Sequence, residues 1–225
     1  MRVLVTGQVG LDKKQYLDHL ARFARDHGED LAVFHIGDMM YREAPDVPPG
    51  RILDLPLARL HSLRRAVMRD VLSALPKHRH VLINTHATFR WRHGLFSAFD
   101  FDQLAQFDAD LYITLVDNIE TVHQRMIRDH ALDHSLKDLM VWREEEMLAT
   151  EICAKAHVLS RSQALRPDAG GTAIGPSAAA PRAPHFYVLS RGRHTPTTET
   201  MFKLIFRPHM KKIYPSFPMS HVADL

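Results

Sequence analysis

Residues 3–14 read Val-Leu-Val-Thr-Gly-Gln-Val-Gly-Leu-Asp-Lys-Lys, and this stretch decides the fold. Its first three residues are apolar and two of them are β-branched, which predicts a buried strand that ends at Gly7. Beyond the loop, apolar residues recur at helical spacing at Tyr16, Leu17, Leu20, Phe23 and Ala24. A strand that enters a helix through a glycine- and lysine-containing loop is the setting in which proteins bind phosphate groups.

The loop matches part of the P-loop pattern, which is Gly, four residues, Gly-Lys and then Ser or Thr. Gly7 and Lys13 stand at their places in it, and Gly10 stands where many kinases have a further glycine. Because backbone N–H groups of such a loop point at phosphates, we expect it to hold a nucleotide. The expected nucleotide-binding residues are Gly7, Gln8, Val9, Gly10, Leu11, Asp12, Lys13 and Lys14. The alternative is a strand–turn–helix that contains these glycines and lysines by coincidence.

Two positions of the loop depart from the pattern. Asp12 replaces the second glycine and brings a negative charge close to the expected phosphates. Lys14 replaces the hydroxyl residue that normally binds Mg²⁺, and an ammonium group has no lone pair to offer a metal. Two roles remain open for Lys14: it supplies part of the charge of the missing metal, or it pairs with Asp12.

The rest of the chain alternates short apolar strands with amphipathic helices. Strands are predicted over 31–34, 81–83, 111–116 and 186–189, and helices over 57–75, 118–130 and 136–157, with 86–107 irregular. This order predicts an α/β, three-layer P-loop NTPase fold with a five-stranded, mostly parallel sheet flanked by helices. In such sheets ligands bind beyond the carboxyl ends of the strands.

Four segments in order resemble the nucleoside-monophosphate kinases, most closely the archaeal-type adenylate kinases. They are Leu4-Val5-Thr6-Gly7, the Gly37-Asp38-Met39 region, Leu82-Ile83-Asn84-Thr85-His86-Ala87-Thr88, and 109–117 with Arg125-Met126 on the next helix. The resemblance spans residues 1–157 and the strand at 186–189. It implies an ATP-dependent phosphotransferase, with the need for Mg²⁺ left open.

The resemblance also implies roles for particular side chains. The catalytic candidates are Lys13, Asp38, Arg125 and Arg128. The candidates that bind the acceptor nucleotide are Gly37, Asp38, Arg64, Thr85 and His86. Two plainer interpretations stay open, since the arginines also suit solvated, salt-bridged helix faces and His86 also suits a packed polar position.

A third departure falls on the same function. The segment after the third strand normally begins with an aspartate that helps to hold the metal, and here it begins with Asn84, a weaker Mg²⁺ ligand. Asp12, Lys14 and Asn84 together predict weak or absent phosphoryl transfer. The rival hypothesis is therefore a catalytically inactive nucleotide-binding or interaction module of a larger nucleotide-metabolism or defence protein.

The composition indicates which partners and which cellular location to expect. The net charge is +3, with 29 basic and 26 acidic residues, so no specific nucleic-acid partner is expected. No apolar run reaches the ~18 residues of a membrane helix, there is one cysteine, and the N-terminus lacks the features of a signal peptide. These features predict a cytoplasmic protein without a membrane partner. No metal site is predicted, because His78 and His80 lack a third ligand in sequence.

The domain boundaries follow from composition. Residues 1–159 are predicted to form the kinase-like core, 160–184 a flexible Ala/Pro/Gly-rich insertion, and 185–208 the last strand and a helix that Thr195 and Pro196 begin. The tail, 209–225, faintly resembles the first strand of nucleoside deoxyribosyltransferase-like domains. A fused or associated second domain is therefore a candidate partner.

Overall fold

The computed structural model describes residues 1–91, 94–130, 134–164, 183–191 and 197–210. Its strands are β1 (Arg2–Thr6), β2 (Ala32–His35), β3 (Val81–Asn84), β4 (Thr88–Trp91), β5 (Gly94–Ser97), β6 (Leu111–Val116) and β7 (His185–Ser190). Its α-helices are α1 (Lys13–Asp26), α2 (Ile36–Glu43), α3 (Leu57–Ala74), α4 (Phe101–Phe107), α5 (Ile119–His130), α6 (Leu136–Ala164) and α7 (Thr197–Phe206). Within these ranges, no helix has both the length and the apolar composition to cross a bilayer.

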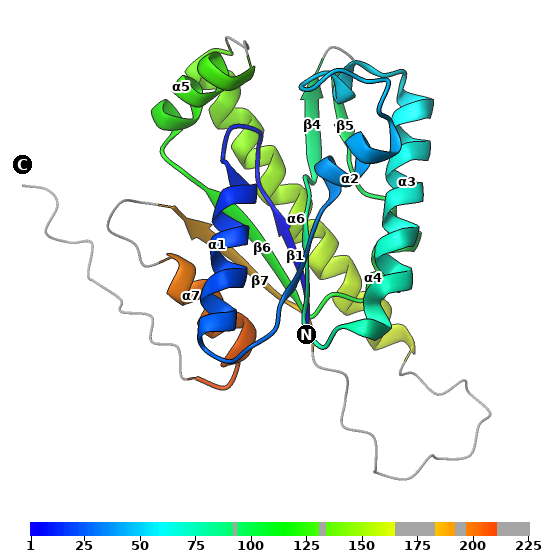
Figure 1. The fold of residues 1–225 in the computed structure, drawn as a ribbon, viewed down its shortest axis with the longest axis vertical. Coiled ribbons are helices and arrows are strands. Elements are labelled where there is room, and N and C mark those ends of the chain that lie inside the picture. The colour runs from blue at the N-terminus through cyan, green and yellow to red at the C-terminus, as the bar shows by residue number, and fades with distance from the viewer. Residues whose placement is uncertain (92–93, 131–133, 165–182, 192–196, 211–225) are drawn as a thin grey trace, which may run out of the picture.

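Five strands form one parallel sheet in the order β2-β3-β1-β6-β7 (Figure 1). The first strand lies at its centre and pairs with β3 on one side and β6 on the other. Each crossover passes through at least one helix, as parallel pairing requires. The predicted three-layer α/β P-loop NTPase fold is confirmed, and the carboxyl ends of β1, β2 and β3 meet at one edge.

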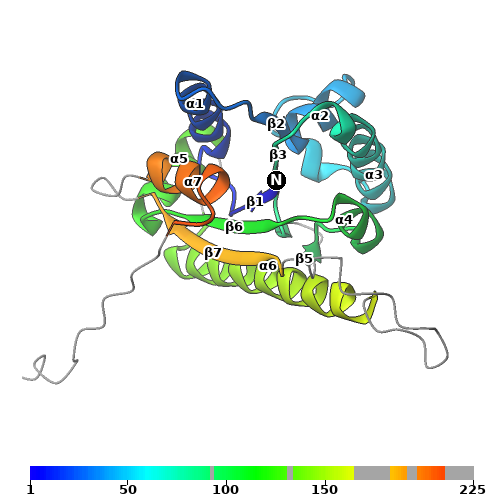
Figure 2. The same ribbon diagram turned by 90° about the horizontal axis from the view of Figure 1, so that it is seen from below.

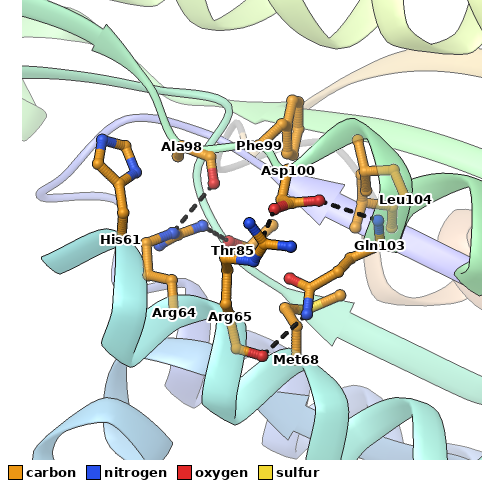
Figure 3. Close-up of a pocket in the computed structure, with 11 residues that line it drawn as sticks. His61, Arg64, Arg65, Met68, Thr85, Ala98, Phe99, Asp100, Gln103 and Leu104 are labelled. Carbon is orange, nitrogen blue, oxygen red and sulfur yellow. Dashed lines mark hydrogen bonds and ion pairs between the residues drawn. The ribbon is translucent and has the colours of Figure 1, made fainter. Parts of the chain in front are cut away.

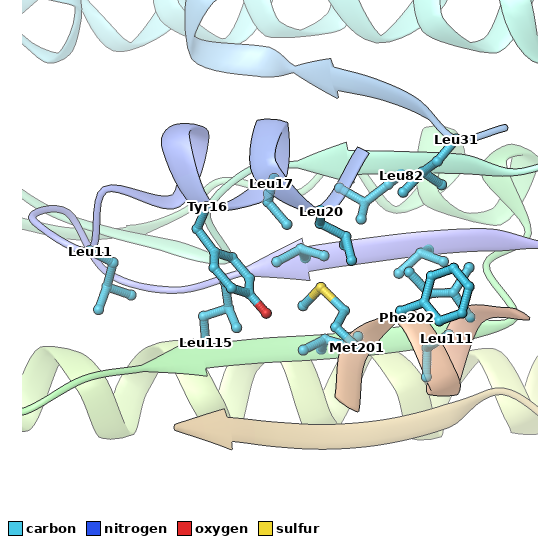
Figure 4. Packing of buried hydrophobic residues seen from close by; sticks show 14 of the residues in the cluster. Leu11, Tyr16, Leu17, Leu20, Leu31, Leu82, Leu111, Leu115, Met201 and Phe202 are labelled. Carbon is cyan, nitrogen blue, oxygen red and sulfur yellow. The ribbon is translucent and has the colours of Figure 1, made fainter. Parts of the chain in front are cut away.

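The central strand divides the core into two layers. Val3 and Val5 face α1 and α7, where Leu17, Leu20 and Met201 pack fully buried (Figure 4). Leu4 faces the opposite side and packs in the cluster that α3, α4 and α6 cover. Figure 2 shows α1 and α7 on one side of the sheet and the long α6 along the other. Since successive strand residues point to opposite faces, an all-apolar β1 needs helices on both sides.

Some predicted boundaries differ from the structure. The segment 86–107 is not irregular, because β4 and β5 pair as an antiparallel hairpin and α4 follows, with Asp100 accepting a capping hydrogen bond from the N–H of Gln103. The helix α6 continues to Ala164, past the predicted start of the insertion at residue 160. Most of that insertion, the predicted helix start at Thr195 and Pro196, and nearly all of the 209–225 tail lie outside the described residues.

Candidate active site

The phosphate loop begins with a glycine that has no substitute. Gly7 has a φ of 140°, and a Cβ atom there would lie 2.7 Å from the carbonyl oxygen of Leu115 and 2.6 Å from Leu11 Cδ1. A backbone oxygen of the central sheet cannot move away cheaply. The turn that leads from β1 toward α1 therefore depends on this glycine, as the motif predicts.

Asp12 shows why its position usually carries glycine. It has φ 48° and ψ 38°, the left-handed region, and it precedes α1 without capping it through its side chain. Asp is among the few non-glycine residues that tolerate this region. Its carboxylate lies 3.2 Å from Arg125 Nε, and Arg125 also pairs with Asp117 at 2.9 Å. Arg125 thus neutralises the charge that Asp12 brings to the loop.

Lys13 is folded into the protein rather than extended into solvent. Only 7% of the residue is exposed, and its ammonium donates to the carbonyl oxygen of Gly7 and lies 3.2 Å from His86 Nδ1. Burial lowers the pKa of Lys13 to about 7, and the negative charge of Glu146 opposes that shift. The lysine and His86, which are far apart in sequence, are therefore neighbours at the base of the loop.

The structure adds Glu146 of α6, a residue that the sequence reasoning missed. Its fully buried carboxylate accepts hydrogen bonds from the backbone N–H groups of Gly7, Ala87 and Thr88 and from the hydroxyl of Thr88, at 2.7–2.9 Å. These bonds join the start of the loop to the segment after β3. A signal existed, because Glu146 shares the helical face of Leu139, Trp142 and Thr150, which are all buried.

Two further groups of paired polar side chains lie near the ends of β2 and β3. Lys14 Nζ lies 2.5 Å from Asp38 Oδ2, so Lys14 pairs with Asp38 and not with Asp12. The Asn84 amide nitrogen donates to His35 Nδ1, and His35 Nε2 donates to Asp18, both at 2.9 Å. The predicted convergence of polar residues at the carboxyl edge of the sheet is present. Lys14, Asp38, His35 and the Asn84 amide nitrogen have partners there, whereas Asn84 Oδ1 is buried without one among the described residues.

A cavity of about 330 Å³ opens over this edge. It is lined by the whole stretch from Gln8 to Lys14, by Gly37 and Asp38 of α2, and by Asn84, Thr85 and His86 after β3. Most of the sequence-predicted loop and acceptor residues therefore surround one space. Arg128 does not join them: it is exposed and pairs with the adjacent Asp129.

Arg64 of α3 is a buried cation that lines this cavity. Its guanidinium donates to the carbonyl oxygen of Ala98 and to the Thr85 hydroxyl, each at 3.0 Å, and it packs 5.3 Å from the centre of the Phe89 ring. Burial lowers the pKa of Arg64 to about 10, which leaves it charged at neutral pH. It also borders a second cavity, of about 190 Å³, between α3 and α4 (Figure 3).

The other arginines of α3 face outward, as the plainer interpretation of that helix expects. Arg59 pairs with Asp46 at 2.8 Å, and Arg65 pairs with Asp100 at 3.2 Å near the second cavity (Figure 3). Within the described ranges, no group of three or more His, Cys, Asp or Glu side chains has a geometry that would hold a metal ion.

Comparisons with known proteins bear on the family and the fold. No curated protein matches the chain by sequence. Among solved structures, the shikimate kinase of Acinetobacter baumannii in complex with shikimate aligns at 12% identity and a TM-score of 0.50, covering 93% of this chain and 95% of the kinase. A putative kinase from Chloroflexus aurantiacus aligns at 12% identity and a TM-score of 0.49, covering 93% and 98%.

The family model described as "AAA domain" (AAA_17) matches residues 6–143, from the last residue of β1 into α6. That range is more than half of the chain and contains the loop, both acceptor segments and Arg125. By this match and by its fold, the chain belongs to the AAA_17 family and has the architecture of a P-loop kinase.

Proposed function

We propose that the chain binds ATP at residues 7–14 and transfers its γ-phosphoryl group, slowly, to a nucleoside monophosphate of the adenylate type. One observation carries the proposal. A single cavity is bordered both by the phosphate loop with Lys13 and by the buried guanidinium of Arg64. Two anion-attracting groups that border one space suit a donor phosphate and an acceptor phosphate.

The donor side uses the loop. Backbone N–H groups between Gly7 and Lys13, with the N-terminus of α1, offer hydrogen bonds to phosphate oxygens. Lys13 leaves the carbonyl of Gly7 when a phosphate takes its ammonium. Arg125 holds the charge of Asp12 away from the nucleotide through their 3.2 Å ion pair.

The acceptor side uses Arg64 and the ends of β2 and β3. Arg64 binds the acceptor phosphate, and Gly37, Asp38, Thr85 and His86 border the same space. An oxygen of the acceptor phosphate attacks the γ-phosphorus, the bond to the bridging oxygen breaks, and two nucleoside diphosphates leave. Transfer depends on positioning and on cationic stabilisation of the transferred group, which Lys13 and Arg64 supply here.

A second candidate is nucleotide binding without transfer. It is favoured by Asn84, which stands where the kinase resemblance expects a carboxylate and whose amide is already bonded to His35. In this case the loop senses or holds ATP for another part of the protein. The two candidates share the donor site and differ in turnover.

A single-turnover assay separates them. Protein in excess over γ-³²P-labelled ATP is incubated with AMP, CMP, GMP or UMP, so that even one slow turnover is counted. Label in a nucleoside diphosphate that requires both the monophosphate and Lys13 supports the kinase. Retention of ATP on the protein without labelled product supports the second candidate, and no retention contradicts both.

A further inference from the structure

Magnesium is the ion that P-loop kinases use, and the residues of this cavity do not suit it. Such sites hold the metal through the hydroxyl after the loop lysine and through a carboxylate at a strand end. The first position is Lys14, whose ammonium repels a cation. The second is Asn84, whose uncharged amide oxygen is a weaker Mg²⁺ ligand than a carboxylate. Among the described residues that oxygen is buried without a hydrogen-bond partner, while the amide nitrogen donates to His35 Nδ1 at 2.9 Å.

The remaining carboxylates of the cavity are also committed. Among the residues that line it, the acidic side chains are Asp12 and Asp38. Asp12 pairs with Arg125 at 3.2 Å and Asp38 with Lys14 at 2.5 Å. A divalent ion would have to displace a cation from one of these pairs and would gain the uncharged Asn84 oxygen in addition, a poor donor set for Mg²⁺.

We propose that the ammonium of Lys14 takes the place of the divalent cation, so that this site binds the triphosphate of a nucleotide without Mg²⁺. The inference rests on the proposed nucleotide site. Lys14 is adjacent to the loop lysine, lines the same cavity and pairs there with Asp38. Lys13 and Lys14, which both line this cavity, then face the triphosphate as two cations.

Lys14 is free to turn toward a ligand. More than half of its side chain is exposed, and so is nearly half of that of Asp38, so their ion pair is of the solvent-exposed kind that contributes little free energy. A triphosphate carries several negative charges and competes well with one carboxylate for the ammonium. The hydrogen bond to Asp38 raises the pKa of Lys14, which keeps it charged over the whole neutral range.

The test is calorimetric titration of the full chain with ATP, once in EDTA and once in excess MgCl₂. The variants are Lys14→Thr, which restores the hydroxyl, and Lys14→Thr with Asn84→Asp, which restores both metal-binding groups. Lys155→Thr is the matched control. Lys155 is also an exposed, ion-paired lysine, bonded to Glu151 at 2.7 Å, and it does not line the cavity.

We expect the native Kd for ATP to agree within about threefold between the two buffers, and Lys14→Thr to weaken metal-free binding at least about tenfold, or 1.4 kcal/mol. The double variant gains a preference for Mg²⁺, and Lys155→Thr behaves as the native chain.

Native binding at least about tenfold tighter with Mg²⁺ overturns the inference and leaves the proposed function standing. Unchanged metal-free binding in Lys14→Thr also overturns it. If the native chain binds ATP in neither buffer, the proposed function fails and the inference fails with it.

Discussion

The carboxylate of Glu146 accepts a hydrogen bond of 2.9 Å from the backbone N–H of Gly7, which lies 139 positions away in the chain. Through this bond α6 fixes the first residue of the phosphate loop. The same carboxylate accepts hydrogen bonds from the N–H groups of Ala87 and Thr88, so the phosphate loop and the segment after β3 share one anchor. The negative charge also balances the buried cations Lys13 and Arg64.

Glu146→Gln tests this anchor. A glutamine side chain has one acceptor oxygen, so it can replace only one of the two carboxylate oxygens. Its NH₂ group then faces either the N–H groups of Gly7 and Ala87 or the N–H group of Thr88. We expect the free energy of unfolding to fall by about 2–3 kcal/mol, since a buried donor loses its acceptor. Urea denaturation measures the loss. Glu145→Gln is the matched control: Glu145 is partly exposed and pairs with Arg90, and the variant leaves no fully buried donor without an acceptor, so we expect a loss of about 1 kcal/mol. Equal losses in the two variants would contradict the anchoring role.

Asp12→Gly and Asp12→Ala test the left-handed backbone. Both variants remove the ion pair with Arg125, so their difference reports the backbone alone. At φ 48° an alanine is strained and a glycine is not, and we expect Asp12→Gly to be the more stable by about 1 kcal/mol after the entropy of unfolded glycine is counted. Denaturation midpoints at matched slopes check this value. An alanine variant as stable as the glycine variant would show that the loop relaxes to another conformation.

Lys13→Met tests the buried ammonium through pH. Burial lowers the pKa of Lys13 to about 7 in the folded chain, from an ordinary value of 10.5. Between those values the unfolded chain binds more protons than the folded one, so rising pH stabilises the native protein. The cost of burying the charge is fully present below pH 7 and is gone above pH 10.5.

Methionine lacks that charge. We therefore expect Lys13→Met to be more stable than the native protein at pH 6, with the difference shrinking by about 1.4 kcal/mol per pH unit between pH 7 and 10. Unfolding free energies of both proteins across this range give the slope. A difference that does not change with pH would mean that Lys13 keeps an ordinary pKa in the folded state.

Arg64→Met tests the acceptor side. The variant removes a buried guanidinium that borders the cavity, so we expect affinity for a nucleoside monophosphate to fall at least about tenfold while affinity for ATP stays within about threefold. Calorimetric titrations with AMP and with ATP give the two values. Arg65→Met is the control, because Arg65 is the next residue on α3 but is exposed and pairs with Asp100. Equal effects of both variants on AMP binding would remove Arg64 from the proposed acceptor site.

Local sequence patterns predict much of the fold. The apolar strand before Gly7, the helical spacing after it and the later apolar runs predict the parallel sheet, and α3 and α5 lie almost where their periodicity places them. The sequence reasoning missed the hairpin of β4 and β5, because each strand has only four residues and β5 contains a single aromatic residue, Phe96. The sequence reasoning also missed the short helix α2, which begins at Ile36 directly after β2 and has no side-chain cap to mark its start.

The sequence suggests members of the candidate site but not their pairings. Motif spacing indicates Lys13 and the family resemblance adds Asp38 and His86, but neither shows that Asp12 meets Arg125 or that Lys14 meets Asp38. Those pairs join residues brought together by the sheet. The sequence reasoning missed Glu146 because three consecutive glutamates, 144–146, suggest a solvated face. Only the packing of α6 against β1 buries the third of them.

We propose that the loop from Gly7 to Lys14 binds a nucleoside triphosphate through Lys13, and the proposed function depends on this claim. Its most direct test is calorimetric titration of ATP at pH 6.5, where Lys13 is mostly protonated, into the native chain and into Lys13→Met. We expect saturable one-to-one binding by the native chain and a loss of at least about thirtyfold, or 2 kcal/mol, in the variant. Equal affinities in the two proteins, or no heat of binding with the native chain, would contradict the claim.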